Sequence, residues 1–247
     1  MTEKIQLSKP FVTSSERDII NKVIKSHFWA SGSGVGYVKK FENNLNKFTD
    51  AKTCLAVNSG TAALELSLSL FNLKNKEVLV PSLTFVSTAH AIMLNGAKPI
   101  FVDVNHKTLC LDEKQIQESI TEKTKAILPV HFAGYPCNLT AIRSICKKND
   151  LYLIEDAAHA IGSTFKNKKI GRHGDAVCFS FHPVKNLAMP TGGAITINHK
   201  NHQEFRKKIE SRRWCGISDR NGVDYDVHEL GRNYYMNEFS AAIGLVQ

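Results

Sequence analysis

The sequence predicts an α/β fold of the doubly wound kind, in which a mainly parallel sheet carries helices on both faces. Short apolar runs recur along the chain at residues 54–57, 77–80 and 151–155. Such runs are typical of strands that are buried on both faces, and stretches with helical apolar spacing separate them. With 247 residues, 43% of them hydrophobic, the chain is also long enough for a well-buried core.

Residues 1–30 are expected to form an N-terminal arm and a helix. Ser14 or Ser15 can cap this helix, with Glu16 in its first turn. Its apolar stripe consists of Ile19, Ile20, Val23 and Ile24.

Residues 31–36, SGSGVG, are predicted to be a loop. Their glycines follow the spacing GxGxG without a preceding strand, so the dinucleotide-binding fingerprint is not met. A helix is expected over residues 37–48, because Val38, Phe41, Leu45 and Phe48 share one side.

The strand at residues 54–57 turns through Ser59, Gly60 and Thr61 into a run of helix formers. A helix start after a strand presents unpaired N–H groups and the positive end of the helix dipole, which together can bind phosphate. An ordinary N-cap is the alternative interpretation.

The rest of the chain continues the alternation of strands and helices. Strands are predicted over residues 77–80, 99–104, 125–132 and 151–155, and helices over residues 84–94, 139–148 and 237–247. Because ligands gather at the carboxyl ends of strands in such sheets, Phe85, Asp156, Ser180 and Lys185 are expected to converge on one site.

Asp156 ends a strand that is predicted to be buried, where a carboxylate needs a cation or hydrogen-bond donors. Three interpretations remain open. The carboxylate can pair with an arginine or a helix start, or bind a metal together with His159. It can also hold the protonated pyridine nitrogen of pyridoxal phosphate.

Lys185 lies in the stretch SFHPVKNLAMPTGGA, residues 180–194, just past an apolar strand around residues 177–179. Its apolar neighbours are expected to desolvate the ammonium and lower its pKa, as Schiff-base chemistry requires. Alternatively, the lysine stem only covers these apolar groups while its head stays in water.

The net charge of +9 is spread over short basic pairs such as Lys39/Lys40 and Lys147/Lys148. This pattern favours a solvated surface that attracts small anionic substrates over a nucleic-acid-binding module, which stays as an alternative.

The six cysteines are scattered without a CxxC pair, which indicates a reducing cytoplasm and no structural metal. No membrane span is expected, since polar residues interrupt the longest apolar stretch, residues 78–97.

Several motifs in order resemble the DegT-type sugar aminotransferases, pyridoxal-phosphate enzymes with the fold of aspartate aminotransferase. The motifs are SGTAAL (59–64), PSLTFVSTAHAI (81–92), VDV (102–104), EDAAHAIG (155–162), SFHPVKNL (180–187), TGGAI (191–195) and NYYMNEFSAAIG (233–244). The resemblance covers nearly the whole chain. It implies that residues 31–247 form the cofactor-binding large domain and that the smaller C-terminal domain of the family is absent.

The resemblance also implies roles for individual residues. Lys185 would bind the cofactor covalently, Asp156 would contact the pyridine nitrogen, and Phe85 would stack on the ring. Ser59, Gly60, Thr61 and Ser180 match the phosphate cradle, and His159 matches a position near the ring hydroxyl. Asn233 matches an asparagine that reaches the phosphate from a partner subunit, which implies a homodimer with shared sites.

The implied activity is transfer of an amino group from an amino acid, glutamate by family analogy, to a keto group of a nucleotide-linked sugar. Residues 189–193, MPTGG, depart from the Gly-Glu-Gly-Gly of the family, and residues 212–231 form a longer insertion than its simplest members have. A relative that binds pyridoxal phosphate without turnover, or that acts in regulation, is the alternative.

Overall fold

A computed structural model describes residues 8–30, 32–221 and 223–247. The helices are α1 (Ser14–Ser26), α2 (Gly36–Thr49), α3 (Gly60–Ser69), α4 (Val86–Leu94), α5 (Glu113–Ser119), α6 (Leu139–Asn149), α7 (His202–Arg212) and α8 (Glu238–Val246), with the 3-10 turn η1 (Phe132–Gly134). The strands are β1 (Thr53–Val57), β2 (Glu77–Pro81), β3 (Lys98–Val102), β4 (Thr124–Ile127), β5 (Tyr152–Asp156), β6 (Thr164–Phe165), β7 (Lys168–Lys169), β8 (Ala176–Ser180), β9 (Gly193–Ile197), β10 (Ile217–Asn221) and β11 (Asp224–Val227).

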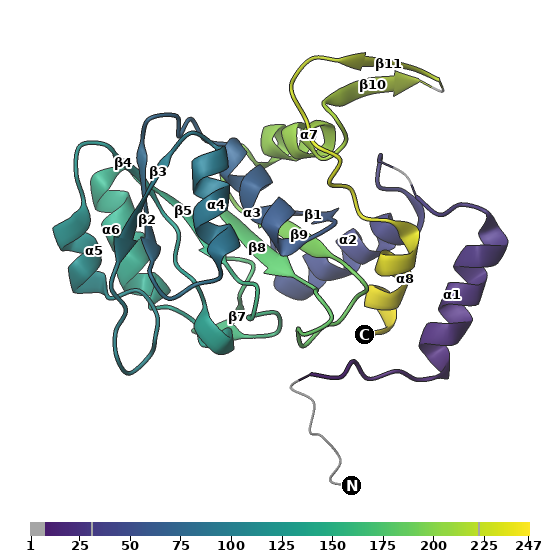
Figure 1. The fold of residues 1–247 in the computed structure, drawn as a ribbon, viewed down its shortest axis with the longest axis horizontal. Helices are drawn as coiled ribbons and strands as arrows, with labels where there is room; N and C mark the ends of the chain where they lie inside the picture. The colour runs from purple at the N-terminus through teal and green to yellow at the C-terminus, as the bar shows by residue number, and fades with distance from the viewer. Residues whose placement is uncertain (1–7, 31, 222) are drawn as a thin grey trace, which may run out of the picture.

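The main sheet of the described chain has seven strands in the order β1-β9-β8-β5-β4-β2-β3. The pairs from β8 to β3 are parallel, and β9 runs antiparallel between β1 and β8. The predicted fold class is therefore confirmed: helices lie on both faces of a mainly parallel sheet (Figure 1).

The alternation of side chains along each strand divides the core into two halves. In β1, Cys54 and Ala56 pack in the half formed with α2, α5, α6 and α8. Leu55 and Val57 point to the other half, which α3, α4 and α7 cover. Both faces of the strand are buried, which explains its continuous apolar sequence.

Some predicted boundaries are wrong. The strand expected over residues 125–132 ends at Ile127, because Pro129 has no N–H for the ladder and the chain then turns into η1. Thr13, rather than Ser14 or Ser15, caps α1, since its side chain forms a capping box with Glu16 three positions into the helix. The strand expected over residues 99–104 spans Lys98–Val102. Of the predicted 31–36 loop, residue 31 lies outside the described residues, and Gly36 already begins α2.

The helix predicted near residue 247 is α8, and it packs beside α1 and α2 (Figure 1). Glu238 at its first position accepts hydrogen bonds from the backbone N–H groups of Tyr37 (2.5 Å) and Val38 (3.4 Å). Val35, the N-cap residue of α2, makes no side-chain cap of its own. The N-terminus of α2 is thus capped from the other end of the sequence.

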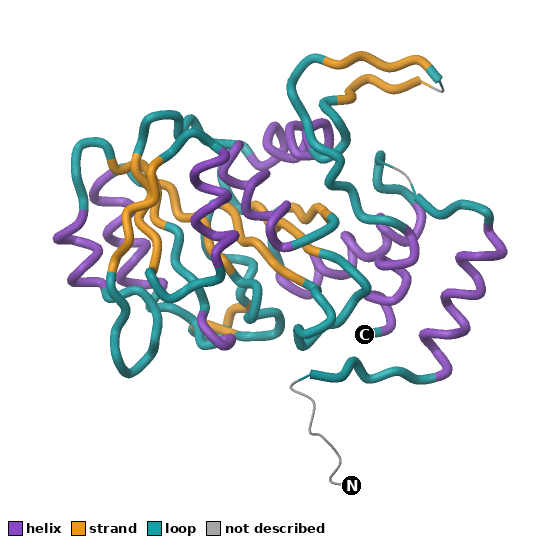
Figure 2. Tube along the Cα trace, viewed as in Figure 1, coloured by secondary structure: helices purple, strands orange, loops and turns teal. Residues whose placement is uncertain are grey.

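The insertion predicted at residues 212–231 contains the hairpin β10–β11, which projects past α7 away from the main sheet (Figure 2). Val223, Tyr225 and Val227 are exposed on it. In the described residues, no helix combines the length and apolar character needed to cross a membrane.

Candidate functional site

A cavity of about 360 Å³ opens at the carboxyl ends of β5 and β8. All candidate site residues named from the sequence, except Asn233, line this cavity. These residues are Ser59, Gly60, Thr61, Phe85, Asp156, His159, Ser180 and Lys185. The chain thus brings together segments that are far apart in sequence, as expected for a doubly wound sheet.

The N-terminus of α3 forms one wall of the cavity. Ser59 caps the helix by accepting a hydrogen bond from Ala62 N (3.1 Å). Within the described chain, the N–H groups of Gly60 and Thr61 have no protein acceptor. Two donors and the positive end of the helix dipole therefore face the cavity, where an anionic group would be stabilised.

Close packing around Gly60 sets this wall of the cavity against Ser180. A Cβ on Gly60 would lie 2.7 Å from Ser180 Cβ, and one on Gly193 would lie 2.3 Å from the Ser59 carbonyl oxygen. Both positions exclude larger residues, so the backbone of the α3 turn lies directly against the ends of β8 and β9. Ser180 presents its hydroxyl beside this turn.

Asp156, 5% exposed, forms the floor of the cavity. Its carboxylate accepts hydrogen bonds from Thr88 Oγ1 (2.9 Å) and Ala158 N (3.1 Å). Within the described part of the chain, no cationic side chain is at ion-pair distance from it. Burial raises its pKa above the usual range, and the two hydrogen bonds oppose that shift.

Lys185 and His159 complete the polar lining. Burial lowers the pKa of Lys185, against a smaller opposing effect from Asp156. Burial also lowers the pKa of His159, and the nearby Lys185 lowers it further. The direction expected for Lys185 from its apolar neighbours is therefore the one that the structure gives, and it favours the neutral amine.

The remaining predicted residues lie at the edge of the cavity or outside it. Phe85, 75% exposed at the N-cap of α4, contributes an aromatic ring to the lining. Asn233 is exposed and does not line the cavity; its carbonyl oxygen accepts a hydrogen bond from Asn58 Nδ2 (3.2 Å). Its side chain is therefore available to groups outside this chain.

Sequence reasoning missed several residues at the site. Thr84, Ser87, Val130 and Thr191 also line the cavity, and Thr88 bonds Asp156 from one turn into α4. The recurrence of hydroxyl residues on both sides of Phe85 was the available signal for Thr84, Ser87 and Thr88. Val130 carries no chemical signal, since it reaches the site only through the turn after β4.

The described residues contain no group of three or more His, Cys, Asp and Glu side chains that could hold a metal ion. All six cysteines are free thiols, and only Cys215 is exposed. The cavity instead fits a ligand of another kind. It would accept an anionic group at the α3 N-terminus, a protonated nitrogen at the buried Asp156, and a carbonyl carbon at Lys185. Pyridoxal phosphate has all three features.

Comparison with known proteins supports this fit. GDP-perosamine synthase of Escherichia coli O157:H7 is 35% identical over 244 residues, which are 98% of this chain and 65% of that protein. PseC of Helicobacter pylori, an aminotransferase involved in the biosynthesis of pseudoaminic acid, superposes with a TM-score of 0.92 at 29% identity; the match covers 99% of this chain and 65% of PseC. The PLP-form of Spr1654 from Streptococcus pneumoniae superposes with a TM-score of 0.91 at 28% identity, covering 99% of this chain and 66% of the other.

This chain therefore spans about two thirds of the length of its relatives. The family match itself extends over residues 11–247, almost the whole sequence. With the sheet order, the cavity and these similarities in agreement, the chain belongs to the DegT/DnrJ/EryC1/StrS aminotransferase family.

Proposed function

We propose that this protein uses pyridoxal phosphate to transfer an amino group from an amino acid, glutamate by family analogy, to a keto group of a nucleotide-linked sugar. The observation that carries the proposal is one cavity that holds both a desolvated lysine and a buried carboxylate without a cationic partner. The names of the GDP-perosamine synthase and PseC relatives support a sugar as the amino acceptor.

The proposed arrangement uses each wall of the cavity. Residues 31–247 form the cofactor-binding unit, in which Ser59, Gly60, Thr61 and Ser180 hold the phosphate. Phe85 would cover one face of the ring, and His159 would lie near the ring hydroxyl. The cofactor supplies an electron sink that stabilises negative charge at the carbon losing its proton.

Asp156 and Lys185 divide the proton chemistry. The Asp156 carboxylate would keep a proton on the pyridine nitrogen, since a buried anion without a cationic partner among the described side chains strongly favours a cationic neighbour. Lys185 anchors the cofactor at rest, and its amine then moves a proton between two carbons as general base and general acid. A lowered lysine pKa suits both steps, because it increases the fraction of neutral amine at any given pH.

The proposal extends to a homodimer. Asn233 is exposed and outside the cavity of its own chain. We infer that Asn233 of each protomer reaches the phosphate held by the other.

The test is spectroscopic. Purified protein is incubated with pyridoxal phosphate, reduced with borohydride and mapped by peptide mass, and the pyridoxyl label is expected on Lys185. Addition of glutamate is expected to convert the absorbance of the bound cofactor to that of the pyridoxamine form. Label on a different lysine would refute the assignment, and binding without conversion by any amino acid would favour the non-catalysing relative.

A further inference from the structure

The carboxylate next to Asp156 belongs to none of the steps above. Glu155 is fully buried, and its side chain points to the opposite face of β5 from the cavity, because successive side chains alternate along a strand. Its Oε2 lies 2.8 Å from Nε2 of His131, which is also fully buried. Its Oε1 accepts a hydrogen bond from the Gly174 backbone N–H.

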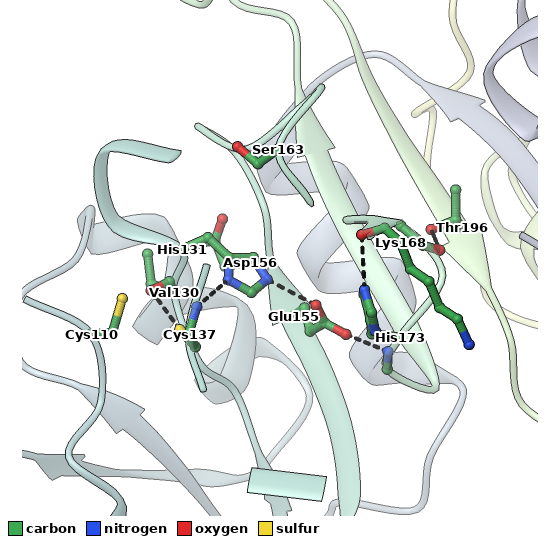
Figure 3. Close-up of polar contacts among 12 residues, drawn as sticks. Cys110, Val130, His131, Cys137, Glu155, Asp156, Ser163, Lys168, His173 and Thr196 are labelled. Atoms are coloured by element: carbon green, nitrogen blue, oxygen red, sulfur yellow. Dashed lines mark hydrogen bonds and ion pairs between the residues drawn. The ribbon is translucent and has the colours of Figure 1, made fainter. Parts of the chain in front are cut away.

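The hydrogen bonds fix the tautomer of His131. The Cys137 backbone N–H donates to Nδ1 (3.1 Å), so Nδ1 carries no proton. The ring proton is therefore on Nε2 and points to Glu155. Figure 3 shows the His131 ring between the Cys137 amide and the Glu155 carboxylate. Both carboxylate oxygens are used by two different donors.

These contacts join three segments that line the cavity. The His131 backbone N–H donates to the Asp156 carbonyl (3.0 Å), and Asp156 N–H donates to the Pro129 carbonyl (2.9 Å). Val130, between them, lines the cavity. Gly174 lies two residues before β8, the strand that ends at Ser180.

We propose that Glu155 and His131 are positioning residues, which hold the backbone of Asp156 and the start of β8 so that the cofactor contacts are set. This inference rests on the proposed pyridoxal phosphate function. Neither side chain reaches the cavity, so their action passes through the main chain at Val130, Asp156 and the 174–180 segment.

Substitutions distinguish the two hydrogen bonds that the Glu155 carboxylate accepts, one from His131 and one from Gly174. Glu155→Gln has only one acceptor oxygen for these two donors, so one of the two hydrogen bonds must be lost. His131→Asn loses the donor at the position of Nε2, whereas His131→Gln can keep an N–H there. Glu42→Gln is the matched control, because Glu42 is also buried and pairs with Arg213 (2.6 Å), but does not line the cavity.

The measurements are pyridoxal phosphate affinity, the induced circular dichroism of the bound cofactor, and the urea midpoint. Loss of a hydrogen bond to a charged group predicts about tenfold weaker binding and an altered dichroism band for Glu155→Gln and His131→Asn. His131→Gln is expected to stay close to wild type. Glu42→Gln is expected to lower the urea midpoint and leave the cofactor signals unchanged.

The outcomes separate this inference from the function on which it rests. Wild-type protein that binds no pyridoxal phosphate would refute both. Wild-type binding with unchanged affinity and dichroism in Glu155→Gln would overturn the positioning role alone. Equal cofactor changes in Glu42→Gln would also overturn it, since they would show a general response to lost stability.

Discussion

Asp156→Asn separates the structural and the chemical roles of the buried carboxylate. The substitution removes the charge and can keep both hydrogen bonds. Asn Oδ1 can accept from Ala158 N, and its Nδ2 can donate to Thr88 Oγ1, whose own proton then turns to Thr84 Oγ1, 2.8 Å away. The geometry is preserved, so the change in free energy reports on the charge.

In the cofactor-free protein we expect Asp156→Asn to increase stability. Burial raises the pKa of Asp156 above its ordinary 3.8, so ionisation of this carboxyl lowers the stability of the folded state. Below the pH at which Asp156 titrates in the unfolded chain, the carboxyl is neutral in both states and the variant gains nothing. As the pH rises through the folded-state pKa, the gain reaches its full value, about 1–2 kcal/mol near pH 7.5.

Cofactor binding is expected to change in the opposite direction. Removing one partner of a buried ion pair costs about 3–5 kcal/mol, which predicts pyridoxal phosphate binding weaker by roughly 10²-fold to several thousandfold.

The assay is urea unfolding of the cofactor-free proteins at about pH 3, below the ordinary aspartate pKa, and at about pH 7.5, with cofactor affinity measured by absorbance. Asp175→Asn is the control, because burial also raises the pKa of Asp175 and it lies outside the cavity. An Asp156→Asn protein that is less stable than wild type at pH 7.5, with unchanged cofactor affinity, would show that the carboxylate serves the fold and would refute this reasoning.

Three further predictions concern single positions. Gly60→Ala would place Cβ 2.7 Å from Ser180 Cβ, so we expect the free energy of unfolding in urea to fall by about 1–3 kcal/mol and cofactor binding to weaken. Unchanged cofactor affinity would contradict the proposal that Gly60 helps to hold the phosphate. Glu238→Gln weakens the cap on α2 and should cost about 1 kcal/mol, seen as a Tm lower by about 2–4 °C; an unchanged Tm would count against the cap. Attachment of pyridoxal phosphate to Lys185, trapped with borohydride over a pH series, should reach half its maximum at a pH below the ordinary lysine pKa of about 10.4, because burial lowers the pKa of Lys185; a midpoint at or above that value would contradict the desolvation.

Much of the fold was predictable, because the apolar sequences of the strands indicate directly that these strands are buried. The runs at β1, β2 and β5 are continuous and apolar, since both faces of these strands are covered. The antiparallel place of β9 was not predictable, because it depends on long-range pairing with β1 and β8. The sequence pattern does not predict α5 or α7.

At the site, the residues with distinctive chemistry could be found from the sequence. Asp156 and Lys185 are conspicuous because a charge follows an apolar run. Val130 and Thr88 are not, since only the folded backbone brings them to the cavity. Glu155 was visible as part of an acidic pair, but its partner His131 lies 24 positions earlier and nothing local connects the two.

The cap that Glu238 provides for α2 has a consequence for synthesis of the chain. Tyr37 leaves the ribosome 201 residues before Glu238. At about 5–20 residues per second, this delay is roughly 10–40 s. During that time the amino end of α2 is exposed to water without its carboxylate, and β1 has no β9 beside it until residues 193–197 have been made. The segment from α2 to β1 therefore stays incomplete until residues 193–238 have been synthesised, and during this interval we expect it to be a substrate for chaperones.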